Sequence, residues 1–324
     1  MMRHRIHHLL YLLIFGSICY HPVLLLADSE PVLFEQSLLG KMWEETGETD
    51  CQICIEKGLF YAPECGTLFQ WTAGCGCAGG PQLDEPLQTD RPNFTSTSVT
   101  VGKGVTQLEF GYTFADDSPA GQEVSYQSFG EFLYRRGILA DWLEFRLGFS
   151  PLQQTEQLGA FQNTTAGSED LSVALQFALT PQSRLLPESA LIVQMSVPTG
   201  STAFTSNQIE PGVNWIYAWK ANDFISLSGS TQGNRSFDEN HRSYLEMAQS
   251  WNVNYTLTKQ LSVFTEWFAL IPCGSNTEQT EHYMDGGFTY LINNNLQLDL
   301  SAGVGLNEAA IDYFVGAGCS IRFP

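Results

Sequence analysis

The stretch Leu143-Glu144-Phe145-Arg146-Leu147-Gly148-Phe149 has an apolar residue at every second position, with a glutamate and an arginine between them. Successive side chains of a β-strand point to opposite faces, so this stretch predicts a strand with one apolar and one charged face. A charged side chain facing lipid at mid-membrane costs about 2 to 4 kcal/mol for Arg or Lys, and less for Glu. In a membrane-spanning strand, the leucines and phenylalanines must therefore face lipid.

The same alternation recurs along the chain from Val105 onward, in about twelve stretches of a length suited to transmembrane strands. Tryptophans often lie near the ends of these stretches, where their rings would suit the membrane interface. The last stretch ends at the aromatic Phe323, followed by Pro324, and an aromatic end suits recognition by the barrel-assembly machinery. Clear examples of the alternation are Leu108 to Phe114, Leu171 to Phe177, Met247 to Tyr255, Leu296 to Leu300 and Tyr313 to Phe323.

The connections between these stretches are by turns short and long, as in transmembrane barrels with tight periplasmic turns and longer outer loops. The sequence therefore predicts an all-β fold, a closed antiparallel up-and-down transmembrane barrel of about 12 strands. A secreted β-sandwich or a soluble barrel is the alternative, because its strands also alternate. The short connections are 136–140, 220–223, 258–260 and 292–294; the long ones are 150–168, 198–208, 232–242 and 271–281.

Residues 1–27 have the features of a secretory signal peptide, with Arg3 and Arg5, an apolar run and Ala27 at the cleavage position. An uncleaved anchor and a lipoprotein attached at Cys19 are the alternatives. We expect export to the outer membrane, with residues 28–88 as a cysteine-containing extension and residues 89–324 as the barrel. Within the extension, apolar residues at 31–45 predict a short amphipathic helix or a loosely packed tail.

The extension contains Cys51, Cys54, Cys65, Cys75 and Cys77. An exported chain meets an oxidising compartment, so two disulfides with one thiol left over are expected. Zinc or another soft metal held by Cys51, Cys54, Cys75 and Cys77 is the alternative, since four thiolates can converge tetrahedrally, although the spacing is not a standard one. We expect no metal and no cofactor.

The formal net charge of -20 makes nucleic acid an unsuitable partner, since phosphate contacts need clustered Lys and Arg. On the polar faces of the predicted strands, an acidic lumen would repel anions and favour cations or neutral solutes. The alternative is a network of ion pairs that braces the wall. Twelve strands predict a narrow or partly plugged passage. The lumen candidates are Glu109, Glu131, Glu144, Arg146, Glu246, Glu266, Asp285, Asp299 and Arg322.

Asp90, Arg91 and Phe94 lie shortly before the first predicted strand. An ion pair of Asp90 and Arg91 inside the lumen would plug or gate the pore. The alternative is a structural cap where the chain reaches its first strand, and Pro92 favours an extended backbone there.

The chain offers little for catalysis, because only His241 and His282 remain as imidazoles after residue 27. His241 and Ser243 have the His-x-Ser spacing of the outer-membrane phospholipase, itself a twelve-stranded barrel, and Asn252 would be the orienting residue. The surrounding residues do not match that enzyme, and no phosphate-binding loop or nucleotide fingerprint is present. We expect no enzymatic activity.

Three motifs carry a resemblance to a known family: Thr89-Asp90-Arg91-Pro92-Asn93-Phe94-Thr95, Tyr134-Arg135-Arg136-Gly137 and Asp285-Gly286-Gly287-Phe288-Thr289-Tyr290. With these the chain resembles, from about Leu87 to Phe323, the bacterial outer-membrane family named "putative MetA-pathway of phenol degradation". The resemblance implies an outer-membrane barrel that takes up small molecules, including aromatic or hydrophobic ones, and brings no catalytic residues. Outer-membrane lipid, the barrel-assembly machinery and a small-molecule solute are the expected partners. A structural or surface-interaction barrel with a blocked lumen is the alternative.

Overall fold

The computed structural model describes residues 65–71, 77–118, 123–158, 161–238 and 240–324, all within the unit Ile53–Pro324. The predicted signal peptide, the predicted helix at 31–45 and three of the extension's cysteines (Cys51, Cys54 and Cys75) lie outside these residues. Within the described ranges, no helix is long and apolar enough to cross a membrane. The described strands are β1 (Thr106–Asp117), β2 (Glu123–Gly137), β3 (Leu143–Phe149), β4 (Pro151–Leu158), β5 (Phe161–Ser168), β6 (Leu171–Thr180), β7 (Glu188–Val197), β8 (Glu210–Lys220), β9 (Ile225–Phe237), β10 (Ser243–Thr256), β11 (Leu261–Cys273), β12 (Glu281–Asn293), β13 (Leu296–Gly305) and β14 (Tyr313–Phe323).

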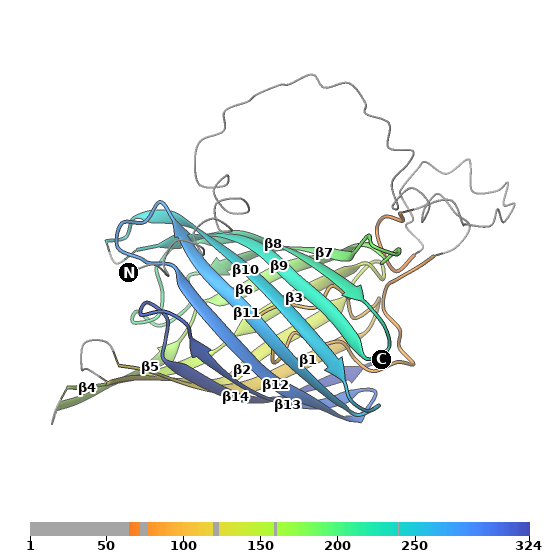
Figure 1. Cartoon of the computed structure of the whole chain (residues 1–324). Helices are drawn as coiled ribbons and strands as arrows, with labels where there is room; N and C mark the ends of the chain where they lie inside the picture. Colours follow the sequence, from red (N-terminus) through yellow and green to blue (C-terminus); the bar gives the residue numbers. More distant parts are fainter. Residues whose placement is uncertain (1–64, 72–76, 119–122, 159–160, 239) are drawn as a thin grey trace, which may run out of the picture. The chain divides into compact units, whose positions relative to one another are not determined.

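Each strand pairs antiparallel with its neighbours, and β1 pairs with both β14 and β2, which closes the sheet (Figure 1). The short strands β3 and β4 both pair with β2 and are separated by Ser150 alone, so they act as one long strand. β5 and β6 are likewise separated only by Glu169 and Asp170. Counted in this way, the wall is a closed antiparallel barrel of 12 strands, which confirms the predicted fold.

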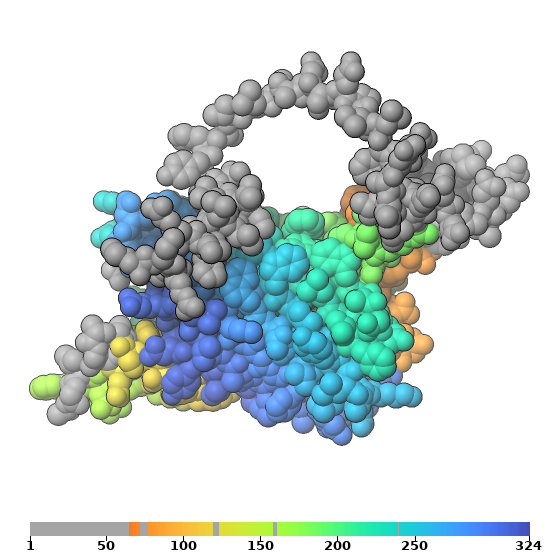
Figure 2. All heavy atoms as spheres, in the orientation of Figure 1, coloured from red at the N-terminus to blue at the C-terminus, as the bar shows by residue number. Residues whose placement is uncertain are grey.

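The outside of this barrel is apolar and its inside is polar. On β13, Leu298 and Leu300 are 45% and 46% exposed, whereas Gln297 and Asp299 are 6% and 3% exposed. A soluble sandwich would bury the leucines and expose the aspartate, so that alternative is wrong. The strands β9 to β14 present a continuous outer surface of side chains (Figure 2).

The predicted long connection 150–168 is formed by a β-hairpin of β4 and β5, which was not predicted. The hairpin extends beyond the other strands (Figure 1), and β5 pairs with β4 alone. Its sequence carries polar residues on both faces, so no alternation of apolar and polar residues indicates the strands. Two other predicted loops are shorter than expected, since β9 continues to Phe237 and β11 to Cys273.

A disulfide joins Cys65 and Cys77. The chain between them pairs with the end of β6, where the Leu68 and Phe69 amides donate to the carbonyl oxygens of Ala178 (2.8 Å) and Leu179 (2.7 Å). This is one of the two expected disulfides. Because Cys77 is bonded to Cys65, it is not available for the tetrathiolate metal site considered above.

Candidate functional site

Residues 82–101, called here the lumen segment, run inside the barrel. The segment enters beside β14, where the Arg322 guanidinium donates to the carbonyl oxygens of Leu83 (3.0 Å) and Glu85 (2.8 Å). Near its other end, the Val101 amide donates to Glu144 of β3 (2.8 Å). Between these points it bonds to side chains of β1, β2, β6, β10, β11 and β13. A segment that contacts strands around the circumference must lie within the lumen.

Arg135 of β2 is fully buried and joins the wall to the segment. Its guanidinium donates to Glu144 through Nε (2.7 Å) and to Glu109 through Nη1 (3.1 Å). It also donates to the carbonyl oxygens of Gln88 (2.9 Å) and Val99 (3.0 Å), at two separate points of the lumen segment. The bidentate arrangement needs a planar guanidinium, so a lysine would not replace it. Sequence reasoning did not select Arg135.

Asp90 and Arg91 lie in the lumen but bind different partners. The Asp90 carboxylate pairs with Arg146, lies 3.8 Å from Arg135 and accepts a hydrogen bond from the Thr97 amide (3.0 Å). Burial by itself raises the pKa of Asp90, but the two guanidiniums and the amide outweigh it, so that the pKa lies below its usual value. The hypothesis of an Asp90–Arg91 ion pair is therefore replaced by two separate pairings.

Arg91 binds acids on the two strands that flank the β1–β14 seam, β2 and β13. Its guanidinium pairs with Glu131, lies 3.4 Å from Asp299 and donates to the carbonyl oxygen of Ala317 (3.3 Å). The space that holds it is made by Gly111 and Gly318, because a Cβ atom at either position would collide with the guanidinium group. These two glycines were not recognised as site residues from the sequence.

Glu266 of β11 holds the middle of the segment. Its carboxylate accepts hydrogen bonds from the amides of Phe94 (2.6 Å) and Thr95 (2.8 Å) and from the Thr95 hydroxyl. The Thr95 and Ser250 hydroxyl oxygens are 2.6 Å apart. The Phe94 ring stacks on Phe268, with centroids 4.4 Å apart. Phe94 thus anchors the segment in an apolar cluster that also contains Tyr283 and Phe314.

The structure brings most of the predicted lumen residues together around the segment. Glu246 and Asp285 are the exceptions among the acids. The Glu246 carboxylate accepts a hydrogen bond from the Tyr244 hydroxyl on its own strand (3.4 Å). Asp285 lies opposite Glu266 in the β11–β12 register, and one of its oxygens is buried with no partner among the described residues. The residues that contact the segment are Glu109, Glu131, Glu144, Arg146, Glu266, Asp299 and Arg322.

The phospholipase-like constellation is not assembled. Ser243 is the first residue of β10 and His241 lies in the turn before it, while Asn252 is nine positions further along the strand. A strand rises about 3.3 Å per residue, which places Asn252 roughly 30 Å from Ser243. Asn252 therefore cannot orient His241 for catalysis.

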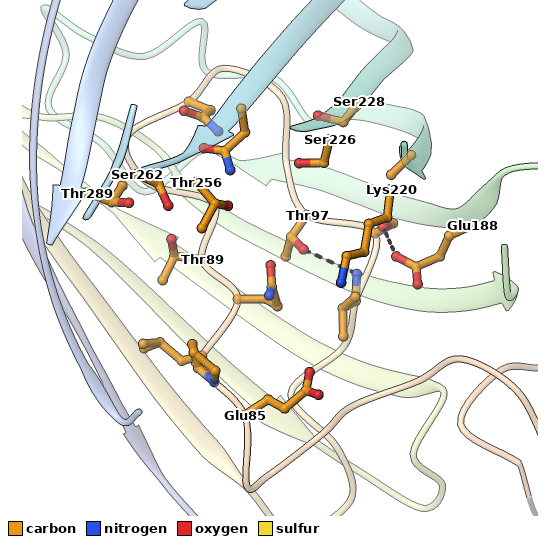
Figure 3. A pocket seen from close by; sticks show the side chains of 18 of the residues that line it. Glu85, Thr89, Thr97, Glu188, Lys220, Ser226, Ser228, Thr256, Ser262 and Thr289 are labelled. Atoms are coloured by element: carbon orange, nitrogen blue, oxygen red, sulfur yellow. Dashed lines mark hydrogen bonds between the residues drawn. The ribbon is translucent and has the colours of Figure 1, made fainter. Parts of the chain in front are cut away.

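A cavity of about 650 Å³ opens in the lumen between the segment and the wall, at the end of the barrel that carries the short turns. Figure 3 shows its lining, in which hydroxyl and amide side chains predominate. On the wall these include Ser226, Ser228, Asn252, Thr256, Ser262 and Thr289, and on the segment Thr89, Asn93, Thr95 and Thr97. The predicted narrowing of the passage is thus produced by the segment, which leaves a polar space beside it.

Similar barrels are known among solved structures. An outer membrane channel, described as COG4313, from Pseudomonas putida F1 is 12% identical, with a TM-score of 0.55 over 73% of this chain and 100% of that chain. Less similar are the NanC porin (10% identity, TM-score 0.42, 67% and 100% coverage) and the transport unit of the autotransporter AIDA-I from Escherichia coli (9% identity, TM-score 0.46, 72% and 95% coverage). At these identities the likeness concerns the fold. No curated protein matches the chain in sequence.

The family model described as "Putative MetA-pathway of phenol degradation" matches residues 89–323. The match begins at Thr89, inside the lumen segment, and runs to the end of β14. It therefore includes the inner part of the segment together with the whole described wall. With an outer-membrane barrel fold and this match over most of its length, the chain belongs to that family.

Proposed function

We propose that the chain is a passive uptake channel for small molecules in the outer membrane, and that the lumen segment is its constriction. The observation that carries this is the nature of the barrel's interior. The segment is held chiefly by ion pairs and hydrogen bonds to wall side chains, and a polar cavity remains beside it. A structural barrel would fill its interior with side chains, whereas this one keeps a cavity of about 650 Å³ beside the segment.

The family and the fold support the same proposal. The Pseudomonas putida barrel, with its TM-score of 0.55, is described as an outer membrane channel, and the family description concerns phenol degradation. A channel in such a family would admit small organic solutes, including aromatic ones. Its acidic wall residues, Glu266 and Asp285 among them, would disfavour anions by repulsion.

The test is to lock the segment in place. Thr95 and Ser250 present hydroxyl oxygens 2.6 Å apart, so the double variant Thr95→Cys/Ser250→Cys places two thiols within reach of a disulfide. In planar lipid bilayers, the oxidised double variant should carry a smaller ion current than the same protein after reduction. The single variants Thr95→Cys and Ser250→Cys, treated in the same way, are the matched controls.

A liposome-swelling assay with the unmodified protein decides between a channel and a blocked barrel. Swelling in small solutes would support the channel. If the unmodified barrel passed neither ions nor small solutes, the channel would be refuted and the alternative of a structural or surface-interaction barrel would stand.

A further inference from the structure

The wall of the cavity carries a continuous band of small hydrogen-bonding side chains over four strands. In the strand registers, Ser228 of β9 lies opposite Asn252 of β10, and Ser226 lies opposite Asn254. The band then continues from Thr256 of β10 to Ser262 of β11 and from Ser262 to Thr289 of β12. All of these residues line the cavity (Figure 3 labels Ser226, Ser228, Thr256, Ser262 and Thr289).

Two side chains that line the cavity are almost completely buried and carry amide atoms that lack a protein partner. Asn252 is 1% exposed, and its Nδ2 has no hydrogen-bond partner among the described residues. Gln107 is 0% exposed, and the same holds for its Oε1. The Oδ1 atom of Asn93, on the lumen segment, is a third such atom. Buried polar groups are normally paired, so one donor and two acceptors here remain for a bound molecule.

The charged groups around the cavity are largely engaged with one another or with the protein backbone. Arg91 is paired with Glu131 and Asp299, and Arg322 donates to carbonyl oxygens of the segment. At the rim, Lys220 pairs with Asp223 (3.0 Å). Glu188 accepts a hydrogen bond from Ser98. The cavity therefore offers hydroxyl and amide groups to a ligand and little uncompensated charge.

We propose that this cavity is a binding site for a neutral polyhydroxylated solute, such as a small saccharide, on its way through the channel; the inference rests on the proposed channel function. Hydroxyl groups donate and accept at once, so one such ligand satisfies both the Asn252 amide and the acceptors of Gln107 and Asn93. The volume of about 650 Å³ falls within the range of small-molecule sites. The buried Phe264 ring, also in the lining, offers an apolar surface to the C–H face of a sugar ring.

This ligand class differs from the aromatic solutes that the family description suggests. A phenol has one hydroxyl group and would leave most of the band without a partner. The lining contains both acids (Glu85, Glu188 and Asp223) and cations (Arg91, Lys220, Lys259 and Arg322), so an anionic solute gains no strong net attraction over a neutral one of the same size.

Maltose, phenol and gluconate serve as probes of a neutral saccharide, an aromatic compound and an anionic polyol. Binding is measured by titration calorimetry on the full-length protein, in a detergent without a sugar headgroup. Maltose should bind saturably and more tightly than the other two probes. Asn252→Ala and Thr256→Val should each weaken maltose binding roughly three- to tenfold, the effect of losing one neutral hydrogen bond.

Asn214→Ala is the matched control, because Asn214 is 3% exposed on β8, also carries an unpaired amide oxygen, and does not line the cavity. Asn214→Ala should leave maltose binding unchanged. If Asn252→Ala does not fold, Thr256→Val still tests the site, because valine has nearly the same shape as threonine. Phenol binding tighter than maltose binding, or equal maltose binding by both cavity variants and wild type, would overturn the site.

Ion current in bilayers separates this inference from the channel proposal. Maltose binding without any current would remove the channel and leave the site standing. If the protein carries current but maltose neither binds to it nor blocks that current, the site is refuted and the channel stands.

Discussion

Gly111 of β1 lies directly opposite Gly318 of β14, and the guanidinium group of Arg91 fills the space above both. The two strands belong to the seam that closes the barrel. The missing side chains therefore let the lumen segment lie against the wall at this point. Arg91 in turn pairs with Glu131 on β2 and Asp299 on β13, the strands on either side of the seam.

Gly111→Ala should open the channel more often. The three atoms nearest to the new Cβ atom all belong to the Arg91 guanidinium group, at the end of a flexible side chain, so we expect the arginine to move and not the wall. Hydrogen bonds to charged groups contribute about 1.5 to 3 kcal/mol, so the open probability should rise roughly ten- to hundredfold. Single-channel recording measures it.

Gly233→Ala is the control for this substitution, because its Cβ atom would have only ordinary contacts with Met247 and Leu245. Equal open probabilities for Gly111→Ala and wild type would show that Arg91 does not hold the segment.

Protonation of Asp90 should release the segment only in strong acid. The pKa of Asp90 lies below its ordinary value near 3.8. The carboxylate therefore contributes fully to holding the segment above that pH, and this contribution is lost as the pH falls through the lower folded-state pKa. Current recorded between pH 7 and pH 5 should therefore show no step due to Asp90. Wild type should reach a larger current only below about pH 4. Asp90→Asn should show this larger current already at neutral pH. A wild-type step near pH 6 that disappears in Asp90→Asn would contradict this assignment.

Glu266→Gln should loosen the middle of the segment. The glutamate accepts from two amides and a hydroxyl, whereas the NH₂ group of glutamine would face another donor. Leaving such a group unsatisfied costs about 1 to 3 kcal/mol. Hydrogen exchange of the Phe94 and Thr95 amides should accelerate by roughly five- to hundredfold.

Glu246→Gln makes the same change on the neighbouring strand β10 without touching the segment. It should leave the exchange of those two amides as in wild type. Equal acceleration by both variants would point to a general loss of wall stability.

Reduction of the Cys65–Cys77 bond should leave the barrel intact. The disulfide closes a loop with a sequence separation of 12 outside the wall, while the strands are closed by backbone pairing alone. The heat-dependent shift of the folded barrel on a denaturing gel should occur at the same temperature with and without reductant. Protease cleavage near Cys77 should become faster after reduction, because the loop loses its covalent constraint.

The wall could be predicted from the sequence because its signal is local. Alternation such as that of Gln297 to Leu300 states within a few residues which side chains face lipid. The β4–β5 hairpin could not be predicted because it lies beyond the barrel, where neither face must be apolar. Polar residues such as Gln153 and Thr164 therefore show no alternation.

The partners inside the lumen could not be predicted, because they are set by closure of the barrel. Arg91 and Asp299 are 208 residues apart in the sequence. The two faces of β2 could not be assigned along its whole length either: Gly130 and Glu131 have positive φ values of 81° and 27°, and the β1–β2 register shifts between Glu109 and Gly111. A bulge of this kind interrupts the alternation, so the faces assigned in one half of β2 do not extend to the other.

The lumen segment enters and leaves the barrel at the same mouth. The Leu87 amide donates to the carbonyl oxygen of Asn294, in the turn between β12 and β13, and the Lys103 amide donates to Asp141, in the turn between β2 and β3. The segment therefore folds into the lumen as a loop and does not pass through the barrel from one end to the other. It can be withdrawn through this one mouth without separating any pair of strands, so that unblocking this barrel requires no reversal of its assembly.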